Sequence, residues 1–105
     1  MKVTIDPWMA LGDPTRRQVL ARVAECPRSV AEIASGLPVS RPAVSQHLRV
    51  LAEANLVAAR KEGRRRVYRV QPDGLRRMQR ELERFWSQAL ENLKSIAEQG
   101  EEGPK

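Results

Sequence analysis

Apolar residues recur every three or four positions over much of the chain, a spacing that predicts amphipathic helices. A short helix is expected over residues 7–11. Asp13 and Pro14 then form a helix start, because Asp caps free backbone N–H groups and Pro loses no hydrogen bond at the first helical position. This helix should run to about Glu25, because Pro27 stops the apolar repeat.

Two closely spaced helices should follow. Ser29 and Glu32 form a capping box that opens a short helix, and Gly36 suits a left-handed position just past the end of that helix. Ser40 caps a second helix, which is expected over residues 41–54. A short helix, a tight turn and a capped second helix are typical of a helix-turn-helix.

The helix over residues 41–54 has one apolar stripe and one polar face, and Asn55 suits a left-handed stop. The residues expected to point inward are Val44, Leu48 and Leu51. On the opposite face, at 100° per residue, lie polar side chains that are free to meet a partner.

A basic hairpin is predicted directly after this helix. Residues 56–60 and 65–70 are strand-like, and Gly63 in the connection between them supplies a positive φ. Tyr68 is expected to bury its ring on the inner face of the sheet. A basic two-stranded hairpin that follows a helix-turn-helix is a wing, so the predicted fold is mostly α with a small two-stranded β wing.

The last predicted helix runs from about Asp73 to Ala97, which makes it about 37 Å long at 1.5 Å per residue. One small winged domain cannot cover the apolar stripe of a helix of that length. The stripe either folds back on its own core or is shared with a second copy of the chain, and we favour the second copy. Residues 1–98 would then be one DNA-binding and dimerisation domain, followed by a disordered tail over residues 99–105. The stripe consists of Leu75, Met78, Leu82, Phe85, Trp86, Ala89, Leu93 and Ile96.

Charge is concentrated in one place. The chain has 105 residues and a formal net charge of +6, and residues 60–69 hold six basic residues against Glu62 alone. Such a run is often only a solvated face, but this one accounts for nearly all of the excess charge. A basic protein of this size typically meets nucleic acid or an anionic surface. We expect double-stranded DNA as the partner.

The chain has few of the residues that form disulfides, metal sites or catalytic pairs. It has one histidine, and its one cysteine, Cys26, rules out an intrachain disulfide and is expected to pack as a small hydrophobe. No apolar run is long enough to span a membrane, so we expect a cytoplasmic protein with no membrane partner. There is no Gly-rich phosphate loop, no paired acids in a cleft-like context and no Cys–His neighbourhood, so an enzyme is not expected.

Four motifs, in this order and spacing, resemble the ArsR/SmtB-type winged-helix transcriptional repressors of bacteria, over roughly residues 7–97. The motifs are Leu11-Gly12-Asp13-Pro14-Thr15-Arg16, Ser40-Arg41-Pro42-Ala43-Val44-Ser45-Gln46-His47-Leu48, Leu51-Ala52-Glu53-Ala54-Asn55-Leu56-Val57 and Gly63-Arg64-Arg65-Arg66-Val67-Tyr68. The resemblance implies a recognition helix in the major groove, a wing along the flanking DNA, and repression of the protein's own operon through a pseudo-palindromic operator.

The resemblance also implies a homodimer that forms through the first and last helices. The side chains expected at that interface are Trp8, Leu11, Leu82, Phe85, Trp86, Ala89 and Leu93.

The chain departs from the metal-sensing members of this family. Residues 30–35 contain no Cys-x-Cys motif, and the last helix contains no histidine. A zinc or soft-metal site needs three or four ligands, so we predict no metal site and no cofactor. The chain resembles a branch that does not sense metals, and its inducer is unknown.

A recognition helix reads DNA with its N-terminal residues, so Arg41, Ser45 and Gln46 are the best candidates for base edges. Arg49 is expected to meet phosphate, and His47 either packs or contacts phosphate. The wing-tip candidates for phosphate or minor-groove contacts are Arg64, Arg65 and Arg66, with Arg60 and Lys61 behind them. The rival functions are a protein–protein interaction module and sequence-blind binding of nucleic acid.

Overall fold

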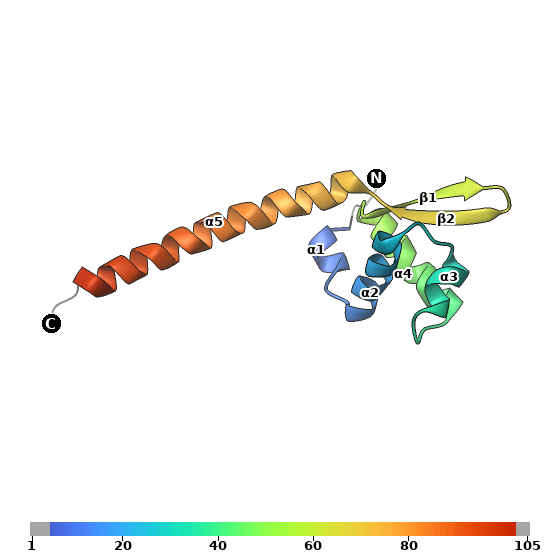
Figure 1. The fold of residues 1–105 in the computed structure, drawn as a ribbon, viewed down its shortest axis with the longest axis horizontal. Helices are drawn as coiled ribbons and strands as arrows, with labels where there is room; N and C mark the ends of the chain where they lie inside the picture. The colour runs from blue at the N-terminus through green and yellow to red at the C-terminus, as the bar shows by residue number, and fades with distance from the viewer. Residues whose placement is uncertain (1–4, 103–105) are drawn as a thin grey trace. The chain divides into compact units, whose positions relative to one another are not determined.

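The structure is a computed structural model that describes residues 5–102, with side chains up to residue 100. It divides into two compact units, residues 5–75 and residues 76–102. The elements, in chain order, are α1 (Pro7–Ala10), α2 (Pro14–Glu25), α3 (Val30–Ser35), α4 (Arg41–Glu53), β1 (Val57–Glu62), β2 (Arg65–Val70) and α5 (Pro72–Glu102) (Figure 1). The predicted fold class, mostly helical with a two-stranded wing, is confirmed.

The predicted helix starts are confirmed by their hydrogen bonds. Asp13 Oδ1 accepts from the backbone N–H of Thr15 at 2.8 Å, and Pro14 is the first residue of α2. Ser29 and Glu32 form the expected capping box at α3. Ser40 caps α4 by accepting from the N–H of Ala43 at 3.2 Å.

Gly36 differs from the expectation, because its φ is −98° rather than left-handed. Its N–H bonds the carbonyl of Ile33 at 3.2 Å, so α3 ends in a tight turn that needs no positive φ. Glycine leaves room there for the end of a neighbouring side chain. A Cβ on Gly36 would lie 2.4 Å from Cζ of Arg22, whose guanidinium donates to the Glu32 carbonyl.

The C-terminal end of α4 is closed by Asn55, whose φ of 65° confirms the predicted left-handed stop. The N–H of Leu56 bonds the carbonyl of Leu51 at 2.9 Å, and the N–H of Asn55 bonds that of Ala52 at 3.0 Å, the two bonds of a Schellman motif. Gly74, in the first turn of α5, lies against this turn. A Cβ built there would be 1.9 Å from the Asn55 carbonyl oxygen.

The hairpin, which we call the wing (residues 57–70), is antiparallel and longer on its first strand than predicted. Glu62 pairs with Arg65, so β1 extends to Glu62 rather than ending at Arg60. The connection is therefore a two-residue turn, Gly63-Arg64, and Gly63 has the predicted positive φ of 64°. Tyr68 of β2 also pairs with Arg28, in the segment between α2 and α3.

The core of the first unit lies where α2, α3 and α4 meet the base of the wing, and the predicted inward stripe of α4 is confirmed. Arg16 and Arg17 hold α1 on this core, because their guanidinium groups donate to the carbonyls of Ala10 and Leu11 at 3.0 and 2.7 Å. The largest fully buried side chains are Ile33, Leu48, Leu51, Leu56, Val19, Val23 and Val44.

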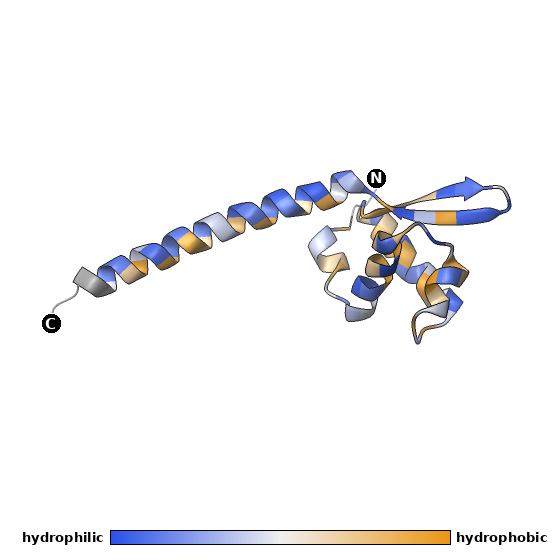
Figure 2. Cartoon of the chain, in the orientation of Figure 1, coloured by the Kyte–Doolittle hydropathy of each residue, from blue (hydrophilic) through white to orange (hydrophobic). Residues whose placement is uncertain are grey.

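The second unit is the remainder of α5, which continues to Glu102 instead of ending near Ala97. The difference arises because Gly100 costs an α-helix only about 1 kcal/mol, whereas Gln99 and Glu101 favour it. Of the predicted tail, residues 103–105 lie outside the described residues. Apolar and hydrophilic residues alternate along the helix (Figure 2). In the described part of the chain, no helix is long and apolar enough to cross a membrane.

Candidate nucleic-acid interface

The outer face of α4 carries the predicted base-reading residues. Arg41, Ser45 and Gln46 are all exposed, opposite the buried stripe of the same helix. Arg49 is exposed over 82% of its side chain and pairs with Glu53 at 3.6 Å. An ion pair so exposed is weak, so it leaves the Arg49 guanidinium available to a phosphate.

His47 is half-buried, between the two faces of α4. Asp13, the cap of α2, lies close enough to interact with it electrostatically. The pKa of the Asp13 carboxyl lies below its ordinary value because the backbone N–H of Arg16 bonds it, with smaller contributions from the Thr15 N–H and from the charges of Arg16 and His47. This position favours the packing alternative for His47, while Asp13 stays ionised at the start of α2.

An open groove of about 530 Å³ lies between α4 and the wing. Ser45 and Arg49 reach it from the helix, and Arg66 reaches it from the wing, so the structure brings three predicted DNA-binding residues together. A hydroxyl and two guanidinium groups along one groove suit the sugar-phosphate backbone of nucleic acid. The full lining is Ser45, Leu48, Arg49, Ala52, Glu53, Ala59, Arg66 and Tyr68.

Tyr68 lines this groove and is half-exposed, so the expectation that its ring is buried in the core was wrong. The reason is strand register. Tyr68 pairs with Ala59 and lies on the same face as Arg66, whereas the neighbouring Val67 points to the other face and is buried.

The outer part of the wing holds a second hollow of about 300 Å³, lined by Ala59, Lys61, Arg64, Arg65 and Arg66. Lys61 lies directly opposite Arg66 in the hairpin. Like charges in that position repel each other, and an anionic partner would relieve the repulsion. Arg65 differs from its neighbours because it forms an ion pair with Glu32 of α3, a partner that the sequence did not reveal.

The residues predicted to form a dimer interface are largely exposed in the single chain. Phe85 is 64% and Trp86 54% exposed, with ring centroids 6.1 Å apart in an edge-to-face arrangement. The same stripe contains Leu90, which the sequence analysis missed. From Leu82 onward the large apolar side chains of the stripe are exposed, whereas Met78 is buried. Also exposed are Trp8, Leu82 and Leu93, while Leu11 and Ala89 are half-exposed.

Cys26 is a free, exposed thiol at the end of α2, so it does not pack as the expected small hydrophobe. Its backbone is extended, with φ −167° and ψ 159°, and it ends α2 just before Pro27. Within residues 5–102, no group of three or more His, Cys, Asp or Glu side chains is arranged to hold a metal ion.

Comparison with known proteins agrees with this geometry. Residues 11–60 match the family model of a helix-turn-helix domain. The HTH-type transcriptional regulator Rv2034 of Mycobacterium tuberculosis is 54% identical over 83 residues, covering 79% of this chain and 78% of that protein.

Two solved structures are also similar. One, a possible transcriptional regulator for arsenical resistance, has a TM-score of 0.74 and 39% identity over 89% of this chain and 97% of that one. The other is the homodimeric winged helix-turn-helix domain of a possible ArsR-family regulator from Mycobacterium bovis, with a TM-score of 0.62 and 29% identity over 81% of this chain and 79% of that one. The chain belongs to the ArsR/SmtB-type winged helix-turn-helix family of DNA-binding transcriptional regulators.

Proposed function

We propose that the protein is a dimeric, sequence-specific repressor that controls its own operon through a two-fold symmetric operator. The observation that carries this proposal is the groove that the exposed face of α4 shares with the basic wing. A protein that inserts α4 into the major groove would place one DNA backbone strand in that groove.

The residues of α4 and of the wing would have two different tasks. Gln46 can bond adenine with two hydrogen bonds, Arg41 can do the same with guanine, and Ser45 can bond a base or a phosphate. Arg49, Arg64 and Arg66 would contact phosphates, which fix the protein on the duplex without carrying sequence information.

The dimer would form through α1 and α5. The support is the exposed apolar stripe of α5 together with the homodimeric state of the similar Mycobacterium bovis domain. Two recognition helices related by a two-fold axis require two half-sites, which is why a pseudo-palindromic operator is proposed. The signal that releases the protein is proposed not to be a metal ion.

The experiment that tests this proposal compares a variant of the reading helix with a variant of the wing. A footprint on the DNA upstream of the protein's own gene first defines the operator. Kd is then measured against log salt concentration, on operator and on random duplex. Gln46→Ala should cost about 1–3 kcal/mol per lost base contact on operator and little on random DNA. Arg64→Ala/Arg66→Ala should weaken binding to both and flatten the salt slope by about 0.9 per lost phosphate contact.

Each rival function has its own signature in this experiment. A wild-type protein that binds random duplex as tightly as operator would be a sequence-blind binder. A protein that binds neither duplex would favour the protein–protein interaction module. A third outcome would exchange the two roles. If Gln46→Ala kept the full preference for operator over random DNA, and the wing variant lost only that preference, the wing would read the sequence and α4 would contact the phosphates.

A further inference from the structure

The arginines of the wing point in two directions. Lys61 pairs with Arg66, and Glu62 pairs with Arg65, in consecutive positions of the antiparallel register. Because successive side chains in a strand point to opposite faces, Arg65 is on the strand face opposite to Lys61 and Arg66, although it also lines the hollow at the wing tip with them. The groove beside α4 is lined by Arg66 and not by Arg65.

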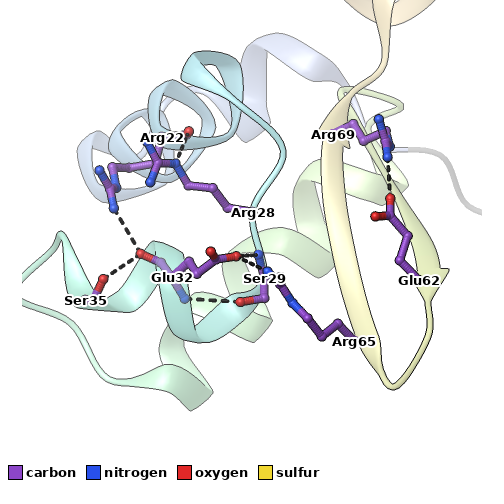
Figure 3. Close-up of polar contacts among 8 residues, drawn as sticks. All are labelled: Arg22, Arg28, Ser29, Glu32, Ser35, Glu62, Arg65 and Arg69. Carbon is purple, nitrogen blue, oxygen red and sulfur yellow. Dashed lines mark hydrogen bonds and ion pairs between the residues drawn. The ribbon is translucent and has the colours of Figure 1, made fainter.

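Arg65 finds its partner on α3 instead, where Glu32 is already fixed in place. Oε1 of Glu32 accepts from the backbone N–H of Ser29 at 2.9 Å in the capping box, and the same oxygen accepts from Nη2 of Arg65 (Figure 3). The hydrogen bonds with Ser29 hold the pKa of this carboxyl below its ordinary value, and the charges of Arg65 and Arg28 lower it further. The wing thus meets an ionised carboxylate that the capping box already holds by hydrogen bonds.

The base of the wing is attached separately. The N–H of Arg28 bonds the carbonyl of Tyr68 at 3.1 Å, and the N–H of Tyr68 bonds the carbonyl of Arg28 at 2.8 Å. Arg65 lies three residues closer to the turn on β2, a distance of roughly 10 Å from Tyr68 at the usual strand rise. A two-stranded hairpin alone is at best marginally stable in water, so a second attachment toward its tip constrains its direction.

The other cations of the wing differ from Arg65. Arg69 pairs with Glu62 inside the hairpin. In the described part of the chain, no carboxylate lies within ion-pair distance of Lys61, Arg64 or Arg66. The face that carries Lys61 and Arg66 therefore has free positive charge, whereas the Arg65 charge is balanced within the protein.

We propose that Arg65 is a positioning residue for DNA binding, which acts through Glu32 to hold the outer half of the wing against α3. Lys61 and Arg66, on the opposite face, make the phosphate contacts, and Arg65 makes none. The inference rests on the proposed function, because it assigns the parts of a wing that binds DNA.

The test uses the full chain and the operator duplex, with Kd measured against log salt concentration. Arg65→Ala is compared with its neighbour on the other face, Arg66→Ala. Glu32→Gln removes the charge of the ion pair but keeps the capping box, which Gln also closes. Glu62→Gln is the matched control, because it breaks an ion pair that stays inside the wing.

We expect Arg65→Ala, Glu32→Gln and the double variant to weaken binding equally, about two- to fivefold, since an exposed ion pair contributes little. Their salt slopes should equal that of the wild type. Arg66→Ala and Lys61→Ala should each lower the slope by about 0.9. Hydroxyl-radical footprinting should show that the flanking protection weakens in Arg65→Ala and Glu32→Gln while the central protection is kept, and Arg65→Lys should restore part of the loss. Glu62→Gln should match the wild type.

Two results would overturn the assignment while leaving the proposed function intact. One is a lower salt slope for Arg65→Ala, comparable to that of Arg66→Ala. The other is tighter binding by Glu32→Gln, which would mean that Glu32 competes with phosphate for Arg65. A wild-type protein that binds no duplex DNA would overturn the proposed function and this inference together.

Discussion

Replacing Gly74 with alanine should destabilise the protein, although the same change in an open helix stabilises it. Gly74 lies in α5, where alanine would gain about 1 kcal/mol in helix propensity. However, the new Cβ would be 1.9 Å from the Asn55 carbonyl oxygen and 2.8 Å from its carbonyl carbon. Both atoms are backbone, and they belong to the turn that closes the recognition helix. Overpacking that shifts the backbone costs about 1–3 kcal/mol and occasionally more, so after the gain in propensity a net loss of up to about 2 kcal/mol is expected.

The assay is urea and thermal unfolding followed by circular dichroism. A net loss of that size lowers the melting temperature by up to roughly 10–15 °C in a domain of this length. Gly100→Ala is the matched control, because Gly100 is in the same helix and a Cβ there would meet nothing within 4 Å. It should leave the midpoint unchanged or raise it. A Gly74→Ala protein that melts at or above the wild-type temperature would refute the packing argument.

Changing Leu82 and Phe85 together to glutamate should give a monomer with much weaker operator binding, and a wild type that sediments as a monomer at micromolar concentration would contradict the proposed dimer. Stoichiometric Zn²⁺, Cd²⁺ or As(III) should not release the protein from operator in a gel shift, and release that persists in Cys26→Ser would point to a metal site built from other residues. Acid should unfold the protein partly through Asp13 and Glu32. Their folded-state pKa values are lowered, so their stabilisation is complete above the ordinary carboxyl range and is lost as pH falls through the lower folded values. Asp13→Asn with Glu32→Gln should therefore flatten the acid limb of a stability–pH curve, and an unchanged limb would exclude this contribution.

Local chemistry made the helix ends predictable. Asp13, Ser29 and Ser40 each bond a backbone N–H two or three residues away, and Asn55 closes α4 through its own φ, so a short window of sequence contains all the relevant atoms. The positive φ of Gly63 was predictable for the same local reason, whereas the pairing of Glu62 with Arg65, which shortens the turn to two residues, was not predicted.

Long-range contacts were not predictable in this way. The sequence gives no sign that Arg65 would pair with Glu32, which lies 33 residues earlier, because several cations of the wing look alike. Tyr68 was assigned to the wrong environment because one residue of register decides which face of a strand is buried. The close approach of the Arg22 guanidinium to Gly36 is likewise a contact that no turn signal reports.

Arg28 and Tyr68 form an isolated β-bridge near the base of the hairpin. Amide hydrogen exchange should therefore be graded along the wing, slow at the amides of Arg28 and Tyr68 and fast near Gly63. The hydrogen bonds between β1 and β2 would open first at the turn and then successively toward the base of the wing. Binding to DNA should then slow exchange mostly at the tip, which means that the entropy lost on binding is confined to the few residues between the bridge and the turn.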